Sequence, residues 1–402
     1  LTTIRFVNQI KCEYTKPMMN ISLMLSLFEM KVHYPLRFTL YKSIYKVDKN
    51  RFLFADPYST DLTDNMRPIY TALEKKDGVT LVKCFPQSEG LKGNSLGEKI
   101  KGRANRSASF NKFIKEYARC GTVFLTESYL PAYAVTPRAE TKVVQLWHGS
   151  GAFKKWGYST LDKSFGASDN KIPMHNCYSL VPVSSSEVMK HYAEAFGCDE
   201  SIIKPLGVPR TDELINYCGN EKEIFIKEHP EFKDKKFILY APTFRGNNIV
   251  SAKDGIGFDI EKLCKSLNDE VLLLKLHPFI KGKVSIPESC KGNCLDISNF
   301  DTNTALKIAD LLITDYSSII FEFALLEKPI IFFAYDLDDY KDNRDFYYPY
   351  EEFVPGPIVK TEDELIKSIK EQQTTDKVVS FKNKYMDACD GKCTEKILKE
   401  LL

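Results

Sequence analysis

The chain has 402 residues, a formal net charge of +2 and a hydrophobic fraction of 43%. This length suffices for two or three domains with sizeable cores, and the near-neutral charge excludes a general nucleic-acid or polyanion-binding protein. No apolar run approaches the roughly 20 residues of a membrane-spanning helix. Eleven cysteines without metal-ligand or redox spacing favour a reducing compartment, so we expect a cytoplasmic protein.

Residues 1–50 form a basic N-terminal segment with eight Lys or Arg and three Asp or Glu. Within it, the apolar residues between Ile21 and Phe28 fit one amphipathic helix. Two interpretations stay open at this point. The helix could lie on an anionic lipid surface, or it could pack against the neighbouring domain, which we favour.

From Arg51 onward, strand and helix patterns alternate, which is typical of doubly wound α/β domains. A segment rich in Gly, Ser and Lys, 87–109, is expected to be a loop. The alternation weakens between residues 207 and 236, which indicates a domain boundary there. The expected strands are 52–55, 79–84, 123–126, 142–147 and 178–183 in the first half, and 237–241, 271–276, 311–314 and 330–333 in the second.

We therefore predict an α/β fold with two doubly wound, Rossmann-like domains. The first covers residues 51–210, the second covers 211–375, and charged helices follow at 376–402. In open α/β sheets, ligands bind beyond the carboxyl ends of the strands. Two such domains facing one another predict an active site in a cleft between them.

The stretch 310–333 reads as strand, polar turn, helix and strand. Ser317 and Ser318 stand where the helix begins, so hydroxyls, free N–H groups and the helix dipole would meet there, as in phosphate sites. An ordinary capped helix without a ligand is the alternative, since serine is a common cap. Glu322 lies one turn beyond Ser318 on the same face, where it could bind a ribose or simply be a surface carboxylate.

Three further polar turns follow predicted strands. His148 lies between a strand end and two glycines that would let a ligand approach, which favours proton exchange over a structural role. Arg245 could bind phosphate through its planar fork or be merely solvated. His277, taken singly, is more often structural. No Walker, GxGxxG or HExxH motif occurs, and the acidic pair Asp336 and Asp338 is only a weak cation signal.

These turns, in this order, resemble the CDP-glycerol glycerophosphotransferase family, the teichoic acid primases and polymerases of Gram-positive bacteria. The resemblance covers about residues 51 to 372 and is specific to the family. The matching stretches are DNMRPIY (64–70), QLWHGSGAFKKWG (145–157), GVPRTDEL (207–214), ILYAPTFR (238–245), LKLHP (274–278), LLITDYSSIIFEFA (311–324) and FVPGPIV (353–359).

The resemblance implies a glycosyltransferase-B-like fold with an acceptor-side N-terminal domain and a CDP-alditol-binding C-terminal domain. It implies that His148 is the catalytic base and that His277 polarises the diphosphate. The remaining expected substrate-binding residues are Arg245, Ser317 and Ser318 for phosphate, Glu322 for ribose, and Thr314, Gly149, Lys154 and Lys155. Because these groups supply positive charge and hydrogen bonds, we expect no cofactor and no metal ion.

The implied activity is transfer of glycerol phosphate from CDP-glycerol, or a related CDP-alditol, to a hydroxyl of a polymer acceptor, releasing CMP. The acceptor is expected to be a lipid-linked polyol-phosphate or glycan at the inner face of the cell membrane, with no nucleic-acid partner. CDP-ribitol as donor, and a nucleotide-sugar glycosyltransferase of the same fold, remain alternatives. A non-catalytic module that binds polyanions or membrane is disfavoured, because such binding needs positive charge rather than histidines and serines at strand ends.

Overall fold

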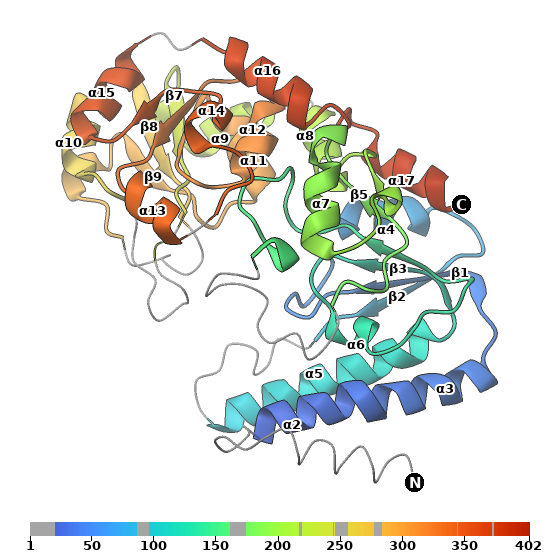
Figure 1. Ribbon diagram of the computed structural model, residues 1–402. Coiled ribbons are helices and arrows are strands. Elements are labelled where there is room, and N and C mark those ends of the chain that lie inside the picture. The colour runs from blue at the N-terminus through green and yellow to red at the C-terminus, as the bar shows by residue number, and fades with distance from the viewer. Residues whose placement is uncertain are drawn as a thin grey trace.

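The computed structural model describes residues 21–86, 96–160, 174–216, 219–243, 245, 256–276, 284–343, 345–371 and 374–402. Two lobes are visible, each built around a parallel β-sheet flanked by helices (Figure 1). The expected α/β class is confirmed. Every strand of the first lobe precedes residue 210, and every strand of the second follows it.

The first lobe contains a four-stranded parallel sheet in the order β2-β1-β3-β4. The central strand β3 is an apolar run buried along its whole length, as a parallel strand covered on both faces must be. A small parallel pair, β5 and β6, continues from β4 through a bridge between Val144 and Leu180. The strands are β1 (Asp48–Ala55), β2 (Thr80–Cys84), β3 (Cys120–Leu125), β4 (Lys142–Gln145), β5 (Val181–Pro182) and β6 (Ile203–Lys204); the helices are α4 (Met66–Glu74), α5 (Leu96–Tyr117), α6 (Leu130–Tyr133) and α7 (Met189–Phe196).

The second lobe contains a six-stranded parallel sheet in the order β12-β11-β10-β7-β8-β9. From β7 the chain moves outward through β8 to β9 and then returns to β10 on the other side of β7. This reversal is the switch point at which ligands bind in doubly wound folds. The strands are β7 (Lys236–Tyr240), β8 (Glu270–Leu274), β9 (Cys294–Asp296), β10 (Leu311–Thr314), β11 (Ile330–Phe333) and β12 (Ile358–Val359); the helices are α8 (Asp212–Ile215), α9 (Glu221–Glu228), α10 (Ile260–Ser266), α11 (Thr302–Ile308), α12 (Ile319–Ala324), α13 (Leu337–Asn343), α14 (Tyr350–Phe353) and α15 (Glu362–Lys370).

The predicted strands are found, with shifts of a few residues at their ends. Three very short strands, β6, β9 and β12, lie outside the predicted set because two or three residues carry no recognisable alternation. The expected loop over 87–109 is wrong from residue 96 onward, where α5 begins. The buried residues Phe113, Ile114 and Tyr117 fix the C-terminal half of α5 on the core. Once a helix is nucleated, each further turn is inexpensive, so it extends through polar sequence despite two glycines.

The N-terminal segment is helical from residue 21 onward and lies along α5 (Figure 1). It consists of α2 (Ile21–Phe28), a π-helical turn (Glu29–His33) and α3 (Tyr34–Ile44). Met30, Tyr34 and Phe38 are buried in the contact, with Phe38 packing on Tyr117 of α5. Packing on the neighbouring domain is therefore seen for the π-helical turn and α3, and for the predicted helix Ile21–Phe28 it stays a prediction. Residues 1–20 lie outside the described part of the chain.

The C-terminal helices connect the two lobes. After α15, helix α16 (Asp376–Tyr385) packs on α12 of the second lobe, and α17 (Cys393–Leu401) returns to pack on α4 of the first (Figure 1). Ile397 is fully buried among apolar residues of the first lobe. The C-terminal end of the chain is therefore part of the first lobe's core.

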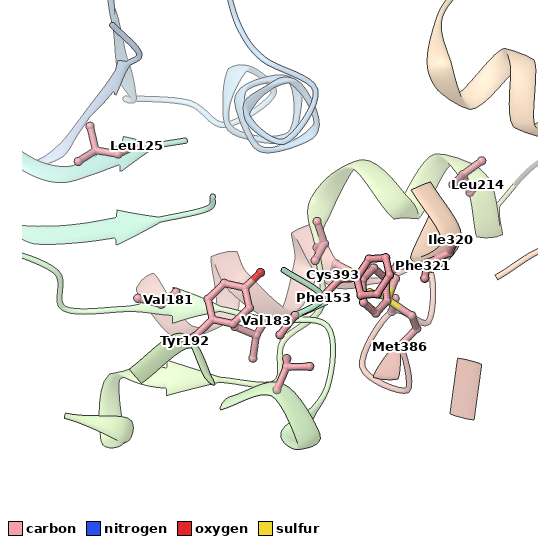
Figure 2. Packing of buried hydrophobic residues seen from close by; sticks show 14 of the residues in the cluster. Leu125, Phe153, Val181, Val183, Tyr192, Leu214, Ile320, Phe321, Met386 and Cys393 are labelled. Carbon is pink, nitrogen blue, oxygen red and sulfur yellow. The ribbon is translucent and has the colours of Figure 1, made fainter. Parts of the chain in front are cut away.

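One apolar cluster runs through both lobes (Figure 2). At the junction it contains Phe153 from the first half of the chain, Ile320 and Phe321 from α12, and Met386 and Cys393 from the C-terminal region. Such a continuous core resists separation of the lobes, because parting them exposes apolar surface to water. The nine cysteines within the described ranges are all free thiols, and no helix in those ranges is both long and apolar enough to cross a membrane.

Replacement of Ile397 tests whether α17 stabilises the first lobe. Ile397→Ala should lower the free energy of unfolding by about 2–5 kcal/mol, since it leaves a cavity in a closed core. Lys399→Ala, on the exposed side of the same helix, is the control and should change it little. Thermal unfolding monitored by circular dichroism measures both. Equal melting temperatures for the two variants would show that α17 adds nothing to the core.

Candidate active site

The polar turns singled out in the sequence follow the C-terminal ends of β4, β7, β8 and β10. Because β7 pairs with both β8 and β10, the turns after these three strands lie at one edge of the second sheet. The turn after β4 carries His148 and continues across to the second lobe. His277 lies outside the described residues, although its strand β8 ends at the same edge.

The segment after β4 changes direction sharply before it crosses between the lobes. Trp147 has φ of 55°, a left-handed conformation that is strained for a tryptophan. Gly151 also has a positive φ, and a Cβ atom there would lie 2.2 Å from the Phe321 ring of α12. Only glycine fits at that position. Strain of this kind persists where the surroundings over-determine the backbone, and it is concentrated at functional sites.

His148 is placed with one nitrogen toward the protein and its ring partly in solvent. Its Nδ1 lies 3.0 Å from Oε1 of Glu127, and its side chain is 52% exposed. The ring also packs against Trp147, with centroids 4.2 Å apart and the ring planes tilted by 35°. A carboxylate at Nδ1 orients an imidazole and stabilises the imidazolium, leaving Nε2 to exchange protons. His148 therefore has the surroundings of a general base.

Glu127 is a residue that the sequence reasoning missed. It follows β3, at the same sheet edge as His148, and its main-chain oxygen accepts a hydrogen bond from Gln145. The available signal was its position two residues after an apolar strand. A lone glutamate there carries no distinctive spacing, so only the fold pairs it with His148.

Glu322 is buried rather than a surface carboxylate, so that alternative is wrong; the residue is 3% exposed. Its Oε1 accepts a hydrogen bond of 2.6 Å from Ser150 and is ion-paired with Arg210. Burial opposes the charge of Arg210, but the adjacent Glu322 carboxylate outweighs it and raises the arginine pKa. Within the described part of the chain no group bonds Oε2 of Glu322, so that oxygen is the one the expected ribose contact would use.

Arg245 is also largely buried, and the solvated alternative is wrong for it. Its guanidinium forms a two-pronged ion pair with Asp336, at 2.6 and 2.9 Å, and contacts Asp315 at 2.7 Å. It lies over the rings of Tyr316 and Tyr340. Burial lowers the arginine pKa, but the two carboxylates outweigh it and raise the pKa above its usual value. Phosphate binding by Arg245 remains a proposal. It requires that Asp336 release at least one of its two bonds to the guanidinium, so that this N–H group can bind phosphate.

Asp315 and Asp336 hold Arg245 in place through ion pairs. Asp315 also accepts hydrogen bonds from the N–H groups of Thr243 and Tyr316, which ties the turn after β10 to the turn after β7. Asp336 accepts a hydrogen bond from the Tyr316 hydroxyl. Among the described residues, no cluster of three or more His, Cys, Asp or Glu side chains is placed to hold a metal ion.

The turn after β10 is as expected, with Ser318 at the N-cap position of α12 and exposed. Neither a cap bond nor another side-chain hydrogen bond occupies its hydroxyl within the described residues, whereas the Ser317 hydroxyl accepts a long bond from the Ile319 N–H. Thr314 differs from the expectation. It is fully buried and its hydroxyl donates to the main-chain oxygen of Ala241, so substrate binding by Thr314 has no structural support.

The remaining predicted residues lie on the crossing segment. The Gly149 oxygen accepts a hydrogen bond from the Tyr192 hydroxyl. Lys154 donates to the Tyr340 hydroxyl and pairs through its backbone with Phe346, while the Lys155 N–H donates to the Asp345 oxygen. The segment that begins at His148 is thus bonded to the second lobe, next to the aromatic residues that surround Arg245.

Comparison with known proteins identifies the family. The sequence profile of the CDP-glycerol:poly(glycerophosphate) glycerophosphotransferases matches residues 37–402. The teichoic acid poly(ribitol-phosphate) polymerase of Bacillus spizizenii is 38% identical over 89% of this chain, which spans 56% of that protein. The teichoic acid ribitol-phosphate primase of the same organism is 35% identical over 90% of this chain and 92% of its own length.

Solved structures show the same architecture. The wall teichoic acid polymerase TagF superposes with a TM-score of 0.72 at 21% identity, over 94% of this chain and 95% of that chain. A UDP-GlcNAc 2-epimerase from Neisseria meningitidis has a TM-score of 0.52 at 13% identity, over 87% of this chain and 99% of its own. The expected glycosyltransferase-B-like fold is confirmed. On the profile match and these relatives together, the chain belongs to the CDP-glycerol:poly(glycerophosphate) glycerophosphotransferase family.

Proposed function

We propose that this chain transfers a polyol-phosphate unit from a CDP-alditol to a hydroxyl group of a teichoic acid acceptor, with release of CMP. The observation that carries the proposal is the His148–Glu127 pair, a half-exposed imidazole backed by a carboxylate, on a segment bonded to the second lobe. Family membership supplies the class of donor and acceptor.

In the proposed reaction, His148 removes the proton from the acceptor hydroxyl. The resulting oxygen attacks the β-phosphorus of the donor, a new P–O bond forms, and the anhydride bond to CMP breaks with its electron pair. Transfer of this kind depends on alignment and charge stabilisation rather than on covalent help from the protein. Ser317, Ser318, Arg245 and His277 are proposed to stabilise the diphosphate, and Oε2 of Glu322 to contact the ribose.

The choice between ribitol and glycerol is a proposal as well. The sequence alone put CDP-glycerol first and CDP-ribitol second. Two relatives that cover about nine tenths of the chain are ribitol-phosphate enzymes, whereas the teichoic acid glycerol-phosphate primase of Bacillus subtilis is 34% identical over 69% of it. This difference favours CDP-ribitol as the donor, with CDP-glycerol as the alternative.

We also propose that the enzyme meets its acceptor at the cytoplasmic face of the membrane, where the N-terminal helices contact lipid. Five exposed apolar residues of the N-terminal helices recur at multiples of four positions, which places them on one helical side: Met24 at 48%, Phe28 at 56%, Leu36 at 67%, Leu40 at 57% and Ile44 at 60% exposure. Arg37, half-buried, lies beside this apolar stripe, whereas Lys42 contacts the ring of the buried Phe38 on another side of the helix. An apolar stripe with a basic residue beside it suits shallow insertion into anionic lipid, which would bring a lipid-linked acceptor to the enzyme.

Substitution of His148 tests the proposed base. His148→Ala should lower kcat for CMP release by about 10²–10⁴-fold and leave CDP binding unchanged, since the base acts only on the acceptor. Glu127→Gln keeps the shape but loses the charge that stabilises the imidazolium, so we expect a loss on the order of 10²-fold. The exposed Glu140→Gln is the matched control. Release assays and calorimetry with CDP measure these effects, and a His148→Ala enzyme with normal turnover would refute the assignment.

Donor identity is tested by supplying CDP-ribitol and CDP-glycerol separately with a synthetic lipid-linked acceptor. We expect CMP as the released nucleotide and faster turnover with CDP-ribitol. Product length by mass spectrometry separates single addition from polymerisation. Release of a nucleoside diphosphate from a sugar donor would instead identify a glycosyltransferase of the same fold.

Membrane docking is tested with vesicles containing phosphatidylglycerol. The double variant Leu36→Gln/Leu40→Gln should bind them at least about tenfold more weakly, because each leucine withdrawn from lipid forfeits roughly 1.5 kcal/mol. Thr39→Gln/Ser43→Gln places the same residues on the same helix beside the apolar stripe and should bind normally. Co-sedimentation measures both, and equal binding by the two variants would contradict docking through this stripe.

A further inference from the structure

Arg210 lies on the connection between the two lobes and bonds to both of them. Its main-chain N–H donates to Asn65 of the first lobe, and its main-chain oxygen accepts a hydrogen bond from Asn303 of the second. Its side chain is mostly buried. The guanidinium donates through Nη1 to the main-chain oxygen of His148 and through Nε and Nη2 to Glu322 on α12. One side chain therefore joins the backbone of the proposed base to the helix that follows Ser317 and Ser318.

The backbone around His148 is fixed on every side by similar bonds. The Trp147 oxygen accepts a hydrogen bond of 2.9 Å from Asn65, the residue that also binds the Arg210 N–H. The Tyr192 hydroxyl contacts the oxygens of Gly149, at 3.1 Å, and Gly151, at 3.0 Å. These contacts hold the strained conformation at Trp147. Of the groups that do so, only Arg210 reaches the His148 oxygen itself and extends to the second lobe.

The Glu322 carboxylate completes the connection. Its Oε1 binds Arg210 and, at the same time, the hydroxyl of Ser150. The segment 148–150 is thus held at its first residue by Arg210 and at its last by Glu322, and these two side chains hold each other. A charge that loses its partner in such a buried position is strongly unfavourable, so the contacts form or break together.

We propose that Arg210, together with Glu322 and Ser150, is a positioning device that aligns His148 only while α12 is docked against the first lobe. Separation of the lobes breaks the Arg210–Glu322 pair and frees the His148 backbone. His148 is then aligned only while α12, which follows the proposed donor-binding serines, is docked. In the separated state the misplaced base does not activate a hydroxyl, so the donor is not consumed. The proposal rests on His148 acting as the base in the proposed function.

Turnover of Arg210 variants tests this proposal. Arg210→Ala should lower kcat by about 10²-fold, the scale of a small misplacement of a catalytic group, with the donor KM nearly unchanged. Added guanidinium ion should restore part of the rate, because it can refill the vacated position between Glu322 and the His148 oxygen. Lys307→Met removes another buried cation, one paired with Glu213 and Glu221. It should lower stability while leaving kcat unchanged.

A double-variant cycle separates the positioning role from a ribose contact. If Arg210 and Glu322 act as one unit, Arg210→Ala combined with Glu322→Gln should lose little more activity than either single variant. Additive losses, a rise in donor KM with unchanged kcat in Glu322→Gln, or an Arg210→Ala enzyme with normal kcat would each overturn the proposal.

Chemical modification provides a readout that does not depend on turnover. Arg210→Ala should change the rate at which diethyl pyrocarbonate modifies His148, measured by peptide mass spectrometry, and Lys307→Met should not. Unchanged modification would overturn the positioning role. An altered rate in a protein whose His148→Ala variant keeps normal turnover would retain the positioning of the segment and reject the proposed base, so the two failures are distinguishable.

Discussion

The arrangement of the site depends on one buried carboxylate. Glu322 takes a hydroxyl from the first lobe and a guanidinium from the connection between the lobes onto a single oxygen atom. A buried ion pair adds little net stability compared with apolar packing, because both charges lose their hydration. Here the apolar cluster around Phe153 and Phe321 supplies the attraction between the lobes, and the ion pair determines how they meet. The ion pair therefore fixes the relative position of the two lobes and adds little to the free energy that holds them together.

The same division of labour explains the strained segment after β4. The chain must leave the first sheet, present His148 to solvent and enter the aromatic residues of the second lobe within about ten residues. The chain turns through left-handed backbone conformations at Trp147 and Gly151. Hydrogen bonds from Asn65, Arg210 and Tyr192 to this segment offset the conformational free energy that the left-handed tryptophan costs. The proposed base, held in this way, would lose little orientational freedom when a substrate binds. That is the condition under which proximity lowers a barrier.

In the second lobe, Arg245 is restrained by ion pairs with Asp315 and Asp336. Such a cation is pre-oriented, and its planar fork faces a carboxylate of the same geometry that a phosphate would offer. The paired carboxylates also keep its charge compensated in a position where burial alone would disfavour it. The polar residues of the two lobes thus form a linked set. Hydrogen bonds run from Arg245 through Asp315 to the turn after β10. Others run from Glu322 of the helix that follows to Ser150 directly and to the His148 oxygen through Arg210.

The sequence by itself determined the fold class, the longer strands and the turns that carry chemistry. Buried parallel strands are continuous apolar runs, and a polar turn after such a run is visible in one dimension, as at His148, Arg245 and Ser317. Arg210 lies in GVPRTDEL (207–214), one of the stretches that resemble the family, but the sequence assigned no role to it. Only the tertiary structure decided which side chains meet. Glu127 and His148, or Arg210 and Glu322, lie 21 and 112 positions apart in the chain, and ion pairs between such residues follow from sheet order and lobe packing rather than from any local pattern. For the same reason α5 was mistaken for a loop over its polar N-terminal half, since the contacts that stabilise it lie at its other end.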